Sequence, residues 1–163
     1  MTPKITVEGR LARSLGLSRA ELKAAAKAFA LRSSARVGVP FREVAVILQD
    51  DASSGVAHLS IMGVAGATDV VTQGYEAIPP EPEGVYGELY VNCDRALAAA
   101  PRRKGWSPAR ELLLYVAHGM DHLSGADDCA PEDCARMRRR ELGWLKAVQP
   151  GVRPCGRKGR RRA

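Results

Sequence analysis

The sequence predicts a single α+β domain in which a small mixed β-sheet packs against helices. The first observation is the length of 163 residues, which suits one domain with one core. The second is the hydrophobic content of 45%, which is enough for a packed interior. The third is the irregular succession of strand-like and helix-like segments, without an internal repeat. We expect this domain to span residues 1–149.

The first part of the chain predicts two strands around a helix. Residues 4–8 alternate between polar and apolar side chains, which indicates a strand. Residues 18–34 form a predicted helix, because Ser18 and Glu21 can make a capping box at its start. The apolar, β-branched run at 42–50 predicts a buried strand.

A short helix and two more strands are predicted next. Residues 51–63 suggest a helix that Gly55 and Gly63 break. Two strands follow, and the loop between them holds three prolines: the strands are predicted at 68–75 and 87–93, and the loop at 76–84.

Helices are predicted to fill the rest of the domain. Residues 94–100 form a short one. A longer helix begins after Ser107, with Pro108 at its first position, and Gly125 suits its end. The last helix is predicted at 131–148.

The net charge of +7 is unevenly spread along the chain. Residues 150–163 hold six of the 25 basic residues and none of the 18 acidic ones, so 19 basic residues remain in the domain. A basic segment of this kind suits nucleic acid, and a disordered, solubilising end is the alternative. The candidate nucleic-acid contacts in this tail are Arg157, Lys158, Arg160, Arg161 and Arg162.

The N-terminal sequence, the hydropathy and the cysteine spacing indicate the cellular compartment. No apolar run reaches the roughly 18 residues that a membrane span needs, and the N-terminus lacks the apolar core of a signal peptide. We therefore expect a cytoplasmic protein with no membrane partner. The cysteines match no zinc framework or disulfide scaffold, so we expect free thiols, with Cys129 and Cys134 as alternative metal ligands because they lie just past His118 and His122. The four cysteines are Cys93, Cys129, Cys134 and Cys155.

The stretch "HGMDHLSGADD" at 118–128 predicts a metal site at the end of the long central helix. His118 and His122 share one helical face, where two imidazoles can hold one ion. Gly125 allows a sharp turn that returns Asp128 toward them. Two imidazoles and a carboxylate suit Zn²⁺, and three protein ligands leave a fourth position open, as in catalytic sites. We expect one Zn²⁺ per chain.

The residue after the first histidine separates this site from one class of enzyme. In the HExxH metalloproteases that residue is the glutamate that serves as general base. Here it is Gly119. The sequence therefore argues against peptide hydrolysis by that route.

The segment "ELLLYVAHGMDHLSGADD" resembles the signature H-G-x-L-H-L-x-G-Y-D-H of the YbeY endoribonucleases, the bacterial rRNA maturation factors. "TDVV" (68–71) and "GELYVN" (87–92) are also similar to segments of that family. The resemblance covers roughly residues 5–146. It implies a zinc-dependent endoribonuclease specific for single-stranded RNA, which matures the 3′ end of 16S rRNA and acts with the small ribosomal subunit in ribosome quality control.

The chain departs from the family pattern at several positions. Asp128 stands where the family has its third histidine, Asp121 replaces a leucine and Ala126 a tyrosine. The family carries an asparagine and an arginine before T-D-V, whereas residues 59–70 here are about two residues shorter and contain no arginine. A connector at 101–106 precedes the long helix. Its three cations are candidate RNA contacts in place of the missing arginine: Arg102, Arg103 and Lys104.

Two aspartates are candidate catalytic residues. Asp127 is expected to orient a ligand histidine, with a polar turn residue as the alternative. Asp121 is a candidate partner of the histidines or a general base, although a solvated surface carboxylate is favoured. The alternative function is an inactive RNA- or ribosome-binding assembly factor that keeps its zinc site.

Overall fold

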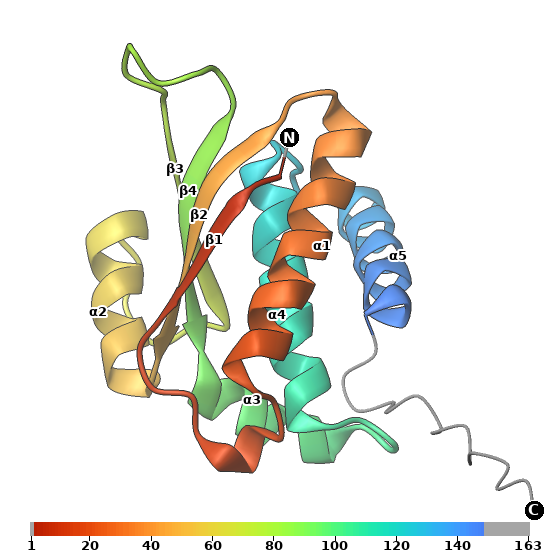
Figure 1. Ribbon diagram of the computed structural model, residues 1–163. Coiled ribbons are helices and arrows are strands. Elements are labelled where there is room, and N and C mark those ends of the chain that lie inside the picture. Colours follow the sequence, from red (N-terminus) through yellow and green to blue (C-terminus); the bar gives the residue numbers. More distant parts are fainter. Residues whose placement is uncertain (1, 149–163) are drawn as a thin grey trace, which may run out of the picture.

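The structure is a computed structural model, and it describes residues 2–148. Figure 1 shows three layers: helix α2 on one side, a sheet in the middle, and helices α1, α4 and α5 on the other side. The described residues contain one four-stranded sheet, and it is mixed. The predicted α+β architecture is therefore confirmed.

The strands lie in the order β1-β2-β4-β3 across the sheet. The first three are parallel, whereas β3 runs antiparallel to β4 and forms one edge. Apolar side chains of these strands that point toward α1 and α4 form the core, together with the facing sides of the helices. The strand bounds are Lys4–Glu8 for β1, Phe41–Gln49 for β2, Val70–Tyr75 for β3 and Val85–Asn92 for β4.

Five α-helices lie within residues 2–148: α1 (Arg19–Val37), α2 (Asp51–Met62), α3 (Cys93–Ala99), α4 (Pro108–Leu123) and α5 (Pro131–Ala147). Short 3-10 turns occupy Arg13–Leu15 and Ala100–Arg102. No helix of this described part is long and apolar enough to cross a bilayer.

The two helix starts that were predicted from capping residues are confirmed. Ser18 accepts a hydrogen bond from the backbone N–H of Glu21, whose side chain accepts one from the Ser18 N–H, so the capping box is present. Ser107 caps α4 by accepting from the backbone N–H of Arg110 at 3.1 Å. These side chains satisfy N–H groups that the helix itself leaves unpaired.

One predicted element is wrong in its interior. Helix α2 runs without interruption through Gly55, which we expected to break it. Asp50 caps this helix by accepting from the Ser53 N–H at 2.8 Å, and a single interior glycine costs only about 1 kcal/mol. Gly63 does end the helix, with a φ of 70° that favours glycine.

Helix α4 is the central helix, because it packs on α1, α3, α5 and the β3–β4 half of the sheet. Glycines allow this close approach. A Cβ on Gly119 would lie 2.7 Å from Leu89 Cδ2, and a Cβ on Gly87 would lie 2.6 Å from Leu123 Cδ2. Gly87 pairs with Gly74 across the two strands, so Leu123 fits over a surface without side chains. The C-terminal end of α4 is thereby held directly against the sheet.

Candidate metal centre

The two imidazoles at the C-terminal end of α4 face each other. The Nε2 atoms of His118 and His122 are 3.0 Å apart, and the rings meet edge to face with centroids 4.4 Å apart. Asp128 Oδ2 lies 3.6 Å from each of these nitrogens. Both imidazoles are about one quarter exposed, so the cluster is open to solvent on one side.

The opposite ring nitrogens are occupied by acceptors. His118 Nδ1 donates to Oε1 of Glu141 at 2.6 Å, and His122 Nδ1 donates to the backbone carbonyl of Ala126 at 2.9 Å. Each imidazole therefore carries its proton on Nδ1 and directs the Nε2 lone pair into the cluster. Two lone pairs that converge in this way, beside a carboxylate, fit a metal cation.

The turn after α4 brings the carboxylate back to the histidines. Gly125 has a φ of 84°, and its N–H donates to the carbonyl of His122 at 2.9 Å. The Ala126 N–H donates to the carbonyl of Asp121 at 3.2 Å. Within residues 2–148, the one group of three or more such side chains that could hold a metal is His118, His122 and Asp128. The structure thus brings together the three predicted ligands.

Sequence reasoning missed Glu141, which is fully buried on α5. Its Oε1 accepts from His118, and its Oε2 lies 3.6 Å from Nη1 of Arg138 without a hydrogen-bond partner. A carboxylate behind a ligand imidazole fixes the ring and raises the basicity of the nitrogen that faces the metal. Glu141 is therefore part of the centre even though it does not point into it.

Asp121 does not lie on the surface, which corrects the solvated-carboxylate expectation. It is fully buried, and its Oδ2 accepts from Nη2 of Arg140 at 2.6 Å. Nη2 of Arg36 lies 3.2 Å from Oδ1. The carboxylate thus joins α4 to α1 and α5 rather than facing the imidazole pair, and its geometry suits a structural role.

Asp127 lies in the turn and contacts Cys129. Its Oδ1 accepts from the Cys129 backbone N–H at 3.1 Å. Hydrogen bonds from the Cys129 thiol and N–H hold the pKa of the Asp127 carboxyl below its usual value. The acceptors on the two Nδ1 atoms are Glu141 and Ala126, so the orienting role expected of Asp127 falls to those residues.

The predicted cations of the connector lie near the other end of α4. Arg103 pairs with Glu111 at 3.4 Å and stacks over Trp106. About 10 Å of helix separates Glu111 from His118, at 1.5 Å per residue. Arg102, Arg103 and Lys104 are exposed but do not reach the metal ligands.

Residues 59–70 contain no arginine, but an arginine of helix α3 contacts this segment. Arg95 of α3 donates to the carbonyl of Ala67 at 2.7 Å and pairs with Asp69 at 3.6 Å. Nothing in the sequence connects Arg95 to this segment, because the contact exists only in the folded chain.

The predicted tail contacts Arg157, Lys158, Arg160, Arg161 and Arg162 lie outside the described residues, and so does Cys155. Three of the four cysteines fall within the described part and are free thiols, as expected: Cys93, Cys129 and Cys134.

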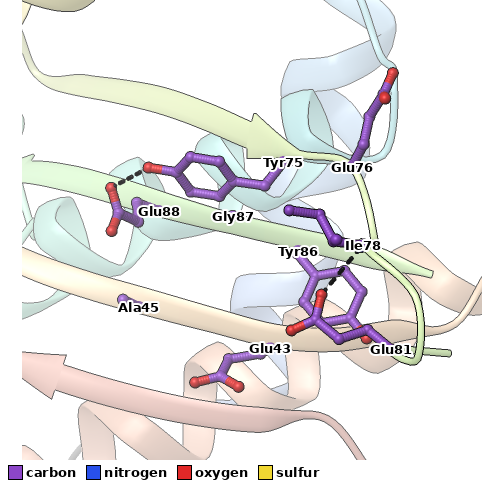
Figure 2. Close-up of a pocket in the computed structure, with 9 residues that line it drawn as sticks. All are labelled: Glu43, Ala45, Tyr75, Glu76, Ile78, Glu81, Tyr86, Gly87 and Glu88. Atoms are coloured by element: carbon purple, nitrogen blue, oxygen red, sulfur yellow. Dashed lines mark hydrogen bonds between the residues drawn. The ribbon is translucent and has the colours of Figure 1, made fainter. Parts of the chain in front are cut away.

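A separate cavity of about 430 Å³ lies on the sheet face turned away from α1 and α4 (Figure 2). Its lining includes Glu43, Glu76, Glu81 and Glu88 but no basic residue. Figure 2 shows the hydroxyl of Tyr75 directed at Glu88, to which it donates at 2.6 Å. A cavity with this charge repels a polyanion.

Comparison with known proteins agrees with the predicted resemblance. The sequence model of the family described as "Endoribonuclease YbeY" matches residues 13–149. A protein of that name from Rhodopirellula baltica is 37% identical over 135 residues, which cover 82% of this chain and 66% of that protein. Another from Arthrobacter sp. is 32% identical over 104 residues, covering 60% and 66%. These alignments span just under two thirds of the relatives' lengths.

A solved structure supports the fold. The solution structure of TM1509 from Thermotoga maritima matches with a TM-score of 0.55 at 24% identity, and the match covers 89% of this chain and 87% of that one. The family match extends over most of the described residues and includes both histidines of the metal centre and the glutamate behind them. On that match the chain belongs to the YbeY endoribonuclease family.

Proposed function

We propose that this protein is a zinc-dependent endoribonuclease that cleaves single-stranded RNA. The observation that carries the proposal is the convergence of two Nε2 atoms 3.0 Å apart with Asp128 Oδ2 at 3.6 Å from each. The names of the similar proteins supply the class of reaction. Maturation of the 16S rRNA 3′ end and quality control of the small ribosomal subunit, in the cytoplasm, form the finer part of the proposal.

The donor set supports zinc among the divalent metals. Two imidazole nitrogens and one carboxylate oxygen are ligands that Zn²⁺ accepts in tetrahedral geometry, with one position left for water or substrate. A bound Zn²⁺ would lower the pKa of a water toward about 7 and polarise a phosphoryl oxygen.

The residues of the chain itself have three tasks in this scheme. Glu141 and the Ala126 carbonyl keep both Nδ1 protons in place, so each Nε2 stays an acceptor. Asp121 fixes the end of α4 through Arg36 and Arg140. Because Asp121 is buried away from the imidazole pair, we assign the proton-transfer role expected of Asp121 to Asp127 instead, whose carboxylate lies in the exposed turn next to Asp128.

The decisive experiment combines metal analysis with a cleavage assay on single-stranded RNA. We expect about one zinc per chain and cleavage that stops when the metal is removed, while a duplex of the same sequence stays intact. His118→Ala should lose both metal and activity. Zinc without any cleavage would refute the nuclease and favour an RNA-binding assembly factor, which the absence of an arginine in residues 59–70 also favours.

A variant that restores an arginine within residues 59–70 tests the role of the missing cation, and the structure decides between Gly63 and Ala65 as its position. Gly63 has a φ of 70°, so an arginine there would strain the backbone. Ala65 is exposed in the loop and has no such constraint. If a missing cation limits the rate, Ala65→Arg should increase cleavage, since one electrostatic contact of this kind is worth about 10²–10³ in rate. The increase should vanish in Ala65→Arg combined with His118→Ala.

The tail at 150–163 is proposed to hold RNA without sequence preference. A chain truncated after Gln149 should bind single-stranded RNA more weakly for every sequence. Each lost phosphate contact should lower the salt dependence by about 0.7 in logarithmic slope. An unchanged slope would leave the tail a solubilising role only.

A further inference from the structure

A second polar cavity, of about 360 Å³, opens beside the first half of α4. Its walls come from the start of α2, the residue before β3, helix α3 and the connector that precedes α4. The lining residues that matter are Asp51, Asp69, Asp94, Arg95, Arg102 and Tyr115. The volume lies in the range of small-molecule sites.

This cavity and the metal centre share one face of α4. Tyr115 lines the cavity, precedes His118 by three residues and precedes His122 by seven, a spacing that places all three on one helical stripe. Side chains on a helix lean toward its N-terminus, so His118 leans toward Tyr115. The rise along α4 from Glu111, which also lines the cavity, to His118 is about 10 Å. A single strand that follows this stripe would therefore meet both the cavity and the metal centre.

Most charges in the cavity are already paired. Asp69 lies 3.6 Å from Arg95, and Glu111 lies 3.4 Å from Arg103. The side chain of Arg102 is exposed and has no hydrogen bond or ion pair with any described residue. The guanidinium of Arg102 is therefore available to bind an anionic group of a ligand.

Two further carboxylates keep acceptor capacity. Asp51 Oδ1 accepts from Asn92 Nδ2 at 2.8 Å, and Asp94 Oδ2 accepts from the Asp51 backbone N–H at 3.0 Å. Each ionised carboxylate offers about four acceptor sites, so these contacts leave lone pairs for hydroxyl or amino donors. The carboxylates do not converge as metal ligands, because within residues 2–148 that arrangement occurs at His118, His122 and Asp128 alone.

We propose that this cavity binds a nucleotide adjacent to the one whose phosphate reaches the metal centre. The carboxylates accept from ribose hydroxyls and base amino groups, and Arg102 donates to the phosphate at the rim. The inference rests on the proposed function for the class of ligand, and it adds a place on the protein where the strand is held.

The test compares Arg102→Glu, Arg102→Lys and wild type in the full-length chain. Binding of single-stranded RNA is measured by fluorescence anisotropy after metal chelation, so that cleavage does not disturb the titration. Loss of a charged phosphate contact should weaken binding on the order of tenfold in Arg102→Glu. It should also lower the logarithmic salt slope by about 0.7. Arg102→Lys should keep most of the affinity, because a lysine still pairs with phosphate.

Arg32→Glu is the matched control, since Arg32 is an exposed arginine of α1 outside the cavity and the charge change is the same. It should bind as wild type does. On zinc-loaded protein, Arg102→Glu should raise KM and leave kcat nearly unchanged, the pattern of a contact equally strong in ground and transition states. Metal content and melting temperature should not change, which separates loss of contact from loss of fold.

The outcomes separate this inference from the proposed function. If wild type cleaves RNA and Arg102→Glu matches it in affinity, salt slope and KM, the cavity is not a nucleotide site. If wild type binds RNA through Arg102 but never cleaves it, the inference stands and the nuclease proposal fails. If chelated wild type binds no RNA, the inference is overturned regardless of what the zinc-loaded protein does.

Discussion

His118 donates a 2.6 Å hydrogen bond to Glu141, a carboxylate that is fully buried on a different helix. The contact links the metal centre on α4 to α5, 23 residues further along the chain. It determines which imidazole nitrogen faces the metal, so a change at Glu141 should alter metal binding without removing a ligand.

Glu141→Gln should weaken metal binding by about 10- to 100-fold, the usual effect of removing an acceptor behind a ligand imidazole. The amide keeps the shape of the side chain but lacks the charge that favours the Nδ1 proton. Competition with a chromophoric chelator measures the affinity. Glu132→Gln, in the exposed first turn of α5, is the control and should bind as wild type does.

Asp128→Ala should lower zinc content well below one ion per chain, because two imidazoles alone rarely hold Zn²⁺. Asp128→His should retain or tighten binding, since an imidazole supplies the third donor that the family pattern has. Metal analysis of the purified variants decides this. Full zinc content in Asp128→Ala would show that another side chain is the third ligand, with Cys129 the first to test.

Asp121→Asn should destabilise the fold by about 1–3 kcal/mol. The change removes the charge that Arg36 and Arg140 share, and breaking a fully buried pair costs about 3–5 kcal/mol. We expect the smaller loss of about 1–3 kcal/mol because the side chains of the two arginines are 32% and 26% exposed and can return to water. Urea unfolding measures the loss. A variant as stable as wild type would mean that the ion pairs contribute nothing net.

Gly119→Ala should cost about 1–3 kcal/mol of stability, because the added methyl would lie 2.7 Å from Leu89 Cδ2. Gly143→Ala is the matched control in α5, where no heavy atom of a neighbouring element lies within 4 Å of the place that the methyl would take. That control should stabilise the protein by about 0.5–1 kcal/mol, as expected for alanine in a helix. Thermal or urea unfolding should place the two variants on opposite sides of wild type.

The hydrogen bond from Tyr75 to Glu88 predicts a pH dependence. This bond, with a smaller effect of burial, raises the pKa of Tyr75 to about 12 from 10.0. The folded state therefore favours the neutral phenol. Its contribution to stability is complete below pH 10 and is lost as the pH rises through about 12. The difference in unfolding free energy between wild type and Tyr75→Phe should shrink over that window, and a constant difference would contradict the contact.

Local patterns predicted the elements well because their signals lie within a few residues. Ser18 with Glu21, and Ser107 with Pro108, mark helix starts by chemistry that acts across one turn. The predicted helix break at Gly55 was wrong because a single glycine costs a helix little stability, and capping and tertiary packing exceed that cost.

The site was predictable only where its residues are close in sequence. The spacing of His118, His122 and Asp128 could be recognised, whereas the pairing of His118 with Glu141 depends on how α5 docks. A weak signal does exist, since Glu141 falls in the buried stripe of α5 with Met137, Trp144 and Leu145 at helical spacing. A carboxylate in such a stripe needs a partner. The same signal applies to Asp121, which falls in the buried stripe of α4 with Leu114 and Ala117 at helical spacing.

The contact between Gly119 and Leu89 also bears on how enzymes of this kind can diverge. The HGxxH of this helix differs at one residue from the HExxH of peptidases. A glutamate at position 119 would, however, have to enter the space that Leu89 fills. Leu89 is fully buried in the central sheet. Truncation of Leu89 to make room for that glutamate would itself cost about 2–5 kcal/mol of stability. The packing of Leu89, together with Thr72 Cγ2 at 3.2 Å from the place of the added Cβ, therefore opposes the carboxylate that peptidase chemistry of this kind uses.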